Sequence, residues 1–300
     1  MGLKLHRYIN FNNKKFSVKF FNQRLPLIYI LFNFFYRRFV VNSNINDKEI
    51  LQFHKSGFTK IDISLKKEIE EYKDKFFIKD EYQNDTLKKV PLELEKNYKK
   101  DLATKIKKKL SPLLKKLEKY FKCDVFLSDI QLWRNYNHND TLNLNVSHFG
   151  NHFHQDSYTM TYSKIFVNLM DVNDDDGPLE VIPREKRNSF VKSFNYKDMD
   201  NYNLFGDKTL IKKNIGKIGE CCLFSSSQIF HRAGVPKNYR DNMQIILVTI
   251  PKKFSEKLQY IDNDKLFENN YELFQKFTKP YSIVKVVKLF FTLFRYKFNA

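Results

Sequence analysis

The chain has 300 residues, of which 42% are hydrophobic, so it can bury a substantial core as one large domain or as one domain with extensions. Its formal net charge is +19, but residues 1–46 carry eight Lys and Arg with no acid, and residues 273–300 carry six with no acid. Subtracting these 14 from 19 leaves only +5 for residues 47–272, so the charge does not indicate a nucleic-acid-binding protein.

The two ends of the chain are basic and apolar. The apolar run LPLIYILFNFF at 25–35 is shorter than the roughly 20 residues that span a bilayer. Residues 283–298 place polar side chains three and four apart, which is typical of a helix in a membrane interface and also of a helix that packs on the main domain. Three cysteines form no even disulfide framework. We therefore expect a cytoplasmic protein, with peripheral membrane contact through the basic ends left open.

Helices are predicted in the first half of the chain. The stretch KEILQFHKSGFTKI at 48–61 predicts a short helix, a stop at Gly57 and a strand. Leucine and isoleucine spacing predicts a second helix over 99–121. We expect this helix to break at Ser111-Pro112, where serine can cap and proline can start a new piece.

Short apolar runs follow from about residue 125, separated by Asn, Asp, Gly and Pro clusters. They read VFLSDIQLWRNY, KIFVNLMDV, PLEVI, GECCLFSS and MQIILVTI. Such runs predict strands, and strands in series without helices between them indicate a sandwich or barrel. The sequence thus predicts a mostly β fold with flanking helices (α+β), and a jelly roll fits it best.

The stretch HFHQDSY at 152–158 contains candidate metal ligands. On a strand, His152, His154 and Asp156 would point to one side. Fe(II) takes two imidazoles and one carboxylate on one face of its octahedron. His154 and Asp156 could supply two of these ligands, and only His231 lies downstream to supply the third.

A candidate anion-binding residue follows His231. His231 is expected at the end of the CCLFSSSQIF strand, and a turn at 234–238 separates it from Arg240. A hairpin here would return the chain past the metal and place a guanidinium beyond it. Arginine binds a carboxylate with a two-pronged fork, so this pair of groups suits a keto-dicarboxylic acid.

These residues resemble a known family. The stretches FHQDSYTMTYSKIFVNLMDVNDDDGPLEVIP and GECCLFSSSQIFHRAGVPKNYRDNMQI are similar to the phytanoyl-CoA dioxygenase family of non-haem Fe(II)- and 2-oxoglutarate-dependent oxygenases. The resemblance covers roughly 48–250. It implies a double-stranded β-helix core, within an oxygenase domain at 47–252 that is flanked by extensions at 1–46 and 253–300.

The resemblance also implies residue roles. The metal ligands fall on His154, Asp156 and His231, and the arginine for 2-oxoglutarate falls on Arg240. Positions that could line the cavity are Trp133, Arg134 and Lys164. The cofactors implied are Fe(II), 2-oxoglutarate and O2. The ligand Asp156 favours hydroxylation over halogenation, and the expected substrate is a small organic or lipid-like molecule.

The chain departs from the family at one place. After the Gly-Pro element at Gly177 and Pro178, the family often has Pro-Gly-Ser-His, whereas this chain has Pro183-Arg184-Glu185-Lys186. The substrate contact of that histidine is therefore absent or replaced. The basic residues here could face an anionic substrate or belong to a solvated loop.

Two other functions are compatible with the same sequence. His152 and His154 form a His-x-His pair, as in cupins, which bind a metal without 2-oxoglutarate. The chain could also be a catalytically silent barrel that its basic ends attach to a membrane or a partner. The first alternative requires His152 for metal binding, and the second predicts that 2-oxoglutarate has no effect on stability.

Overall fold

The computed structural model describes residues 41, 46–80, 89–137, 153, 156, 163–186 and 208–250. Its helices are α2 (Lys48–Ser56), α3 (Lys66–Glu70) and α5 (Lys96–Phe121), with short 3₁₀ turns η2 (Lys73–Lys75), η3 (Asp174–Asp176), η4 (Arg184–Lys186) and η6 (Lys208–Leu210). Its strands are β1 (Phe58–Ser64), β2 (Lys89–Pro91), β3 (Asp124–Tyr136), β4 (Ser163–Asn168), β5 (Leu179–Ile182), β6 (Lys212–Lys213), β7 (Glu220–Phe224), β8 (Phe230–Ala233) and β9 (Tyr239–Ile250).

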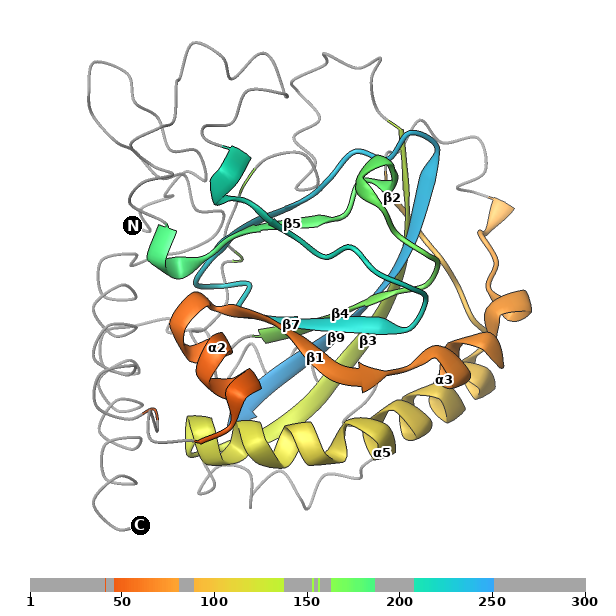
Figure 1. Cartoon of the computed structure of the whole chain (residues 1–300). Coiled ribbons are helices and arrows are strands. Elements are labelled where there is room, and N and C mark those ends of the chain that lie inside the picture. The colour runs from red at the N-terminus through yellow and green to blue at the C-terminus, as the bar shows by residue number, and fades with distance from the viewer. Residues whose placement is uncertain are drawn as a thin grey trace, which may run out of the picture.

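The strands form two sheets that face each other (Figure 1). The larger sheet has the order β1-β7-β4-β9-β3-β2, and the smaller has the order β6-β5-β8. From β4 onward the chain moves between them: β4, β7 and β9 belong to the larger sheet, whereas β5, β6 and β8 belong to the smaller. This alternation is that of a jelly roll. The predicted fold class, mostly β with flanking helices and a double-stranded β-helix core, is confirmed.

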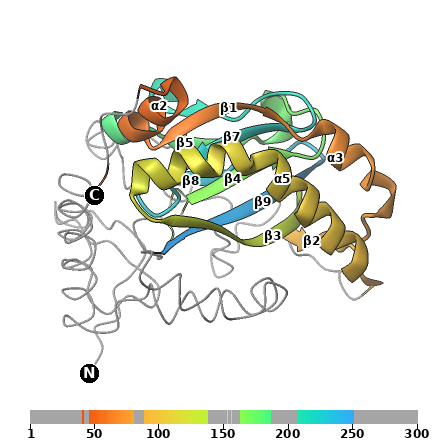
Figure 2. The same cartoon turned by 90° about the horizontal axis from the view of Figure 1, so that it is seen from below.

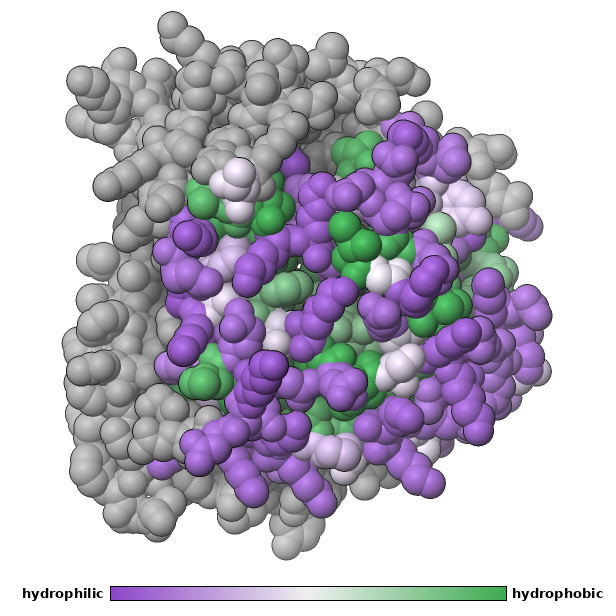
Figure 3. All heavy atoms as spheres, viewed as in Figure 1, coloured by the Kyte–Doolittle hydropathy of each residue, from purple (hydrophilic) through white to green (hydrophobic). Residues whose placement is uncertain are grey.

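The helices cover the outer face of the larger sheet. Figure 2, seen from below, shows α5 running across β4, β9 and β3. Its apolar side packs with one face of these strands in the main core, which includes Leu102, Ile106, Leu110, Leu117, Ile165, Val167, Met243, Ile245 and Leu247. Hydrophilic side chains cover most of the described surface around α5 (Figure 3). None of the described helices is long and apolar enough to cross a bilayer.

A second, smaller core lies between the two sheets. It joins Leu179 and Val181 of the smaller sheet to Phe166, Cys222 and Phe224 of the larger. The neighbouring Cys221 belongs instead to the main core, so the adjacent cysteines point to opposite faces of β7. On β4 and β9, the residues that alternate with the main core therefore point toward the smaller sheet. We call this side the inner face.

Local signals placed the first helix and strand correctly. Asp47 caps α2 by accepting a hydrogen bond from the Ile50 amide at 3.0 Å. Gly57 ends the helix in the left-handed region with φ of 74°, which glycine adopts at little cost. β1 begins directly afterwards.

The predicted break at Ser111-Pro112 is wrong, because α5 continues through Pro112 to Phe121. Proline removes one backbone donor and therefore leaves the Lys108 carbonyl without its helical partner. Lys108 and Pro112 lie on the exposed side of α5, where water can satisfy that carbonyl. On the other side, the buried Leu110, Leu113 and Leu114 hold both halves of the helix against the core.

The segment around His231 also differs from expectation. The predicted strand CCLFSSSQIF is divided: β7 ends at Phe224, a turn follows, and His231 lies on β8 in the other sheet. The residues that follow do not form a hairpin, since β8 and β9 belong to different sheets. The buried Ser225, Ser226 and Ser227 occupy the turn that lets the chain change sheets.

Candidate metal centre

Asp156 and His231 are brought together between the sheets. Asp156 Oδ1 lies 3.8 Å from His231 Nε2. His231 is 5% exposed and lies directly opposite Val181 of the small core, so its ring points to the inner face. The third predicted ligand, His154, lies outside the described residues, as does His152. Within the described part of the chain, no three His, Cys, Asp and Glu residues gather as a metal site.

The backbone and neighbouring rings orient His231. Its Nδ1 lies 3.3 Å from the Ile229 carbonyl, and the ring makes an edge contact with Phe224 at 5.1 Å between centroids. If Nδ1 carries the proton and donates it to this carbonyl, Nε2 presents its lone pair toward Asp156. Metal-binding histidines use the same arrangement, in which the second nitrogen is held by a carbonyl or carboxylate.

Asp156 is held by its backbone amide and by one carboxylate oxygen. Its amide donates a 2.8 Å hydrogen bond to the Ser226 carbonyl, in the turn before β8. Its Oδ2 lies 2.8 Å from the Lys164 ammonium, with both side chains 12% exposed. Because Lys164 pairs with Oδ2, Oδ1 is the oxygen that faces His231. Lys164, predicted to line the cavity, thus contacts a predicted metal ligand.

Phe153 anchors the same segment on the opposite side of the smaller sheet. It packs with Ile182 and Phe230, and the Arg232 guanidinium lies 4.6 Å from its ring centroid. Arg232 is itself paired with Glu180 through Nε and Nη2 at 2.7 and 2.6 Å. Phe153 and Asp156 therefore contact opposite faces of β8.

Arg240 is buried on the inner face with no counter-ion. It is 1% exposed, and none of its three side-chain nitrogens has a hydrogen-bond partner among the described residues. The Phe166 ring lies 5.5 Å from its guanidinium carbon. Burial lowers the pKa of Arg240 to about 10. An unpaired buried guanidinium costs folding free energy, so this position has the properties of an anion-binding site that the described residues do not fill.

The remaining predicted residues fall on different faces of β3. Trp133 lies directly opposite Asn242 and points to the inner face, where its Nε1 has no hydrogen-bond partner among the described residues. Arg134 points the other way, which corrects the expectation that it lines the cavity. Its Nε and Nη2 donate to both carboxylate oxygens of Asp241 at 2.7 Å. Successive residues on a strand alternate, so Trp133 and Arg134 cannot share a face.

Arg184, the first basic residue of the stretch that departs from the family pattern, has a structural role. Arg184 donates from Nη1 to the His54 carbonyl at the end of α2, and from Nη2 to Gln228 Oε1 at 2.6 Å. The Gly-Pro element also has a structural partner. The Gly234 amide donates to the Pro178 carbonyl at 2.9 Å, and the Lys237 amide donates to the Asp175 carbonyl at 2.8 Å. This element therefore fixes the connection between His231 and Arg240.

Sequence reasoning missed Lys89. It lies on β2 opposite Asn135, which in turn lies opposite Arg240, so the three residues form one row across the larger sheet. Its ammonium lies 3.9 Å from the Trp133 ring centroid, on the inner face. β2 is only three residues long and ends in a proline, so no periodicity in the sequence could have identified it.

No protein-family model matches the chain, and no curated protein matches it. The phytanoyl-CoA dioxygenase resemblance therefore stays a prediction. Matches among solved structures include EctD from S. alaskensis with bound Fe, which is 15% identical with a TM-score of 0.43 over 70% of this chain and 81% of that chain. HygX from Streptomyces hygroscopicus with nickel, 2-oxoglutarate and hygromycin B bound is 14% identical with a TM-score of 0.43, over 68% and 88%.

SnoN, described as a non-heme alpha ketoglutarate dependent epimerase from nogalamycin biosynthesis, is 11% identical with a TM-score of 0.42, over 67% of this chain and 82% of that chain. At these identities and TM-scores, the matches do not decide what the chain does.

Proposed function

We propose that the chain is a non-haem Fe(II)- and 2-oxoglutarate-dependent dioxygenase that hydroxylates a small organic or lipid-like substrate. The observation that supports this most is Arg240, a buried guanidinium with no partner among the described residues, on the same inner face as Asp156 and His231. A molecule that binds the metal at one end and carries a carboxylate at the other would also pair with Arg240. A keto-dicarboxylic acid has the required groups at its two ends.

The residues have distinct roles in this proposal. His231 Nε2 and Asp156 Oδ1 hold the metal together with His154, which the sequence predicts as the third ligand. The bound iron supplies the oxidising chemistry with O2 and 2-oxoglutarate. Arg240 orients the co-substrate through a bidentate contact with its far carboxylate, worth about 1.5 to 3 kcal/mol for a charged hydrogen bond. Phe166 and the small core beside it exclude water from that contact.

The donor set fits the metal. Imidazole nitrogen and carboxylate oxygen are the ligands of non-haem Fe(II) sites with open positions. The Lys164 ammonium pairs with Oδ2 and leaves Oδ1 for the metal, so the carboxylate can bind through one oxygen. The proposal retains the domain limits expected from the sequence, 47–252 for the oxygenase domain. Peripheral membrane contact stays a prediction, since both basic ends lie outside the described residues.

The test is anaerobic thermal unfolding with Mn(II), with and without 2-oxoglutarate. A ligand at one hundred times its dissociation constant stabilises the folded state by about 2.7 kcal/mol, and this gain should require the metal. Arg240→Met should remove the 2-oxoglutarate effect while keeping the effect of Mn(II). Arg134→Met is the matched control, because it makes the same change on the opposite face and should keep both effects.

Other outcomes would reject the proposal in different ways. A metal effect with no 2-oxoglutarate effect in the unmodified protein would indicate the cupin-type alternative, and His152→Ala should then abolish metal binding. No effect of either ligand would indicate the catalytically silent barrel. Retention of the 2-oxoglutarate effect in Arg240→Met would show that another residue binds the co-substrate.

A further inference from the structure

Three cations lie together on the inner face, and two of them, Lys89 and Lys164, interact with the Asp156 carboxylate. Lys89 and Arg240 lie in one row of the larger sheet, and Lys164 lies on β4 beside Asp156. All three of these neighbours act electrostatically on Lys89: Lys164 and Arg240 lower its pKa, and Asp156 raises it. The four charged groups therefore share one electrostatic environment.

Lys89 contacts an aromatic ring, and no described acid lies close enough to form an ion pair with it. Its ammonium lies 3.9 Å from the Trp133 ring centroid, a favourable cation–π contact. The described residues offer it no ion pair or hydrogen bond. Burial, together with Lys164 and Arg240, lowers its pKa to about 7. The fold thus holds a lysine at a place where its charge is costly.

The charged groups of this site, with its metal and co-substrate, leave an excess of positive charge. Within the proposed function, the divalent metal, the carboxylate of Asp156, the guanidinium of Arg240 and a doubly charged keto acid carry no net charge together. Lys164 and protonated Lys89 add two positive charges to this neutral set. Three acids also act on Arg240, but Glu180 and Asp241 are paired with Arg232 and Arg134, so only Asp176 offsets part of the excess. Lys164 is 12% exposed and Lys89 is partly exposed, so water screens their charges only in part, and an anion placed beside them gains more than it would in bulk water.

We propose that the primary substrate carries an oxyanion, a carboxylate or a phosphate, and that Lys89 binds it beside the Trp133 ring. This inference rests on the proposed function and narrows its substrate class. Trp133 contributes an apolar surface to the same contact, so the preferred molecule presents its anionic group next to an apolar part. Lys89 is then a specificity-determining residue, whereas Arg240 serves the co-substrate.

The experiment compares matched acids and neutral analogues. The protein is saturated with Mn(II) and 2-oxoglutarate without O2, so that Arg240 and the metal are already occupied. The probes are hexanoate with hexanamide, benzoate with benzamide, and butyl phosphate with butanol, and ligand-observed NMR gives their dissociation constants. The acids should bind at least about tenfold more tightly than their neutral partners. The carboxylate and phosphate pairs show which oxyanion is preferred.

Two substitutions assign the effect to Lys89. Lys89→Met should reduce acid binding to the level of the neutral analogues, and Lys89→Arg should keep the preference. Lys212→Met makes the same change on the exposed strand β6 and should alter nothing. The dissociation constant of 2-oxoglutarate should stay within about twofold in all variants.

The outcomes separate this inference from the proposed function. If 2-oxoglutarate gives no metal-dependent stabilisation in the unmodified protein, the proposed function fails whatever the probes do. If that stabilisation is present but acids and neutral analogues bind equally, only the present inference is overturned. Weaker 2-oxoglutarate binding in Lys89→Met with unchanged probe binding would also overturn it, because Lys89 would then be a co-substrate residue.

Discussion

Two arginines near one end of the β3–β9 pair have opposite environments. Arg134 lies across from Asp241 on the helix-covered face, where two 2.7 Å hydrogen bonds and the Tyr239 ring at 4.3 Å satisfy it. Arg240, which precedes Asp241 on β9, lies on the inner face, and its nitrogens have no partner among the described residues. The paired arginine stabilises the fold, and the unpaired one is retained at a cost. Such a cost is expected where a residue serves a ligand.

The largest difference between the two environments should appear when one charge is removed from each face. Asp241→Ala should destabilise the protein by about 3 kcal/mol, because it leaves Arg134 partly buried without its carboxylate. Arg240→Met should leave the unfolding free energy unchanged or raise it by about 1 kcal/mol, since a buried unpaired cation is removed. Urea unfolding of the ligand-free protein measures both. A loss of 2 kcal/mol or more in Arg240→Met would mean that Arg240 is a structural residue.

Lys89 gives a pH-dependent version of the same test. Its pKa falls from 10.5 in the unfolded chain to about 7 in the fold, so between these values the unfolded state binds the extra proton and stability rises with pH. The cost of Lys89 is therefore full below pH 7 and absent above pH 10.5. The shift of about 3.5 pKa units corresponds to at most about 5 kcal/mol, and because Lys89 is partly exposed, water screens much of this cost. Lys89→Met should therefore stabilise the protein by about 2 kcal/mol at pH 6 to 7.

The gain in Lys89→Met should shrink as the pH approaches 10.5. Chemical unfolding of both proteins at pH 6, 8 and 10 measures the trend. Lys164, Arg240 and Asp156 are the charged groups that act on Lys89, and they remain in the variant. A gain that is the same at every pH would mean that the loss of packing, and not the charge, sets the difference.

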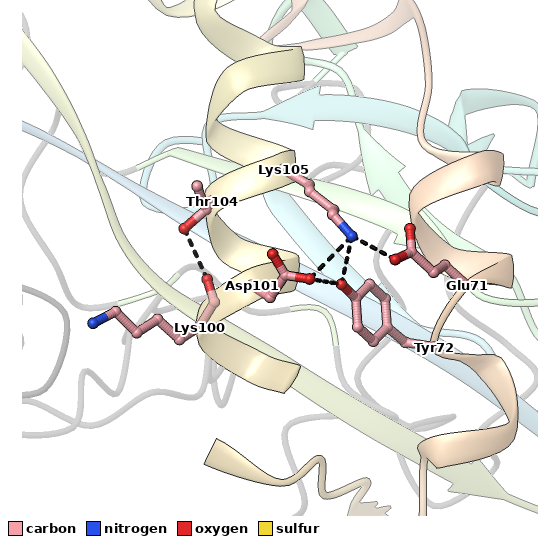
Figure 4. A network of polar contacts seen from close by, with 6 residues as sticks. All are labelled: Glu71, Tyr72, Lys100, Asp101, Thr104 and Lys105. Carbon is pink, nitrogen blue, oxygen red and sulfur yellow. Dashed lines mark hydrogen bonds and ion pairs between the residues drawn. The ribbon is translucent and has the colours of Figure 1, made fainter. Parts of the chain in front are cut away.

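The smallest effect is expected in a network that is saturated and close to solvent. Figure 4 shows Tyr72, in the turn between α3 and η2, bonded through its hydroxyl to Asp101 and to Lys105 of α5, and Lys105 also bonded to Glu71. Tyr72→Phe should cost about 1 kcal/mol, a typical value for one such hydrogen bond. Lys105→Met should cost less, since its side chain is 36% exposed and water screens its ion pairs.

Salt separates the two parts of this network. Thermal unfolding in 0.1 and 1 M NaCl should show a smaller effect of Lys105→Met at high salt and no change in the effect of Tyr72→Phe. A Lys105→Met effect that exceeds 2 kcal/mol and does not depend on salt would mean that this network is as important to the fold as the Arg134–Asp241 pair.

The features that the sequence predicted correctly depend on local signals. Asp47 and Gly57 delimit α2 through side-chain and backbone conformations that those residue types favour. The short apolar runs likewise predicted the strands that form β3, β4, β5, β7 and β9.

The errors concern interactions between distant segments. The Pro112 break failed because packing of buried leucines on the sheet outweighs one missing hydrogen bond. Arg134 was assigned to the cavity because the sequence does not say which face of β3 meets the helices. Lys89 was missed because residues of β3 and β9 form its surroundings, and both strands follow it by more than 30 residues. His154 and the domain limits stay predictions.

The turns that contain Gly177 and Gly234 pack closely against each other, so substitutions at the two positions should interact. A β-carbon on Gly177, whose φ is 60°, would fall on the backbone of Val235 and Pro236, and one on Gly234 would lie 2.8 Å from the Gly177 carbonyl carbon. Each glycine makes room for the backbone of the other turn. In a library of variants the two positions should therefore be epistatic: alanine at either should lower yield, and the double substitution should add little to the worse single one.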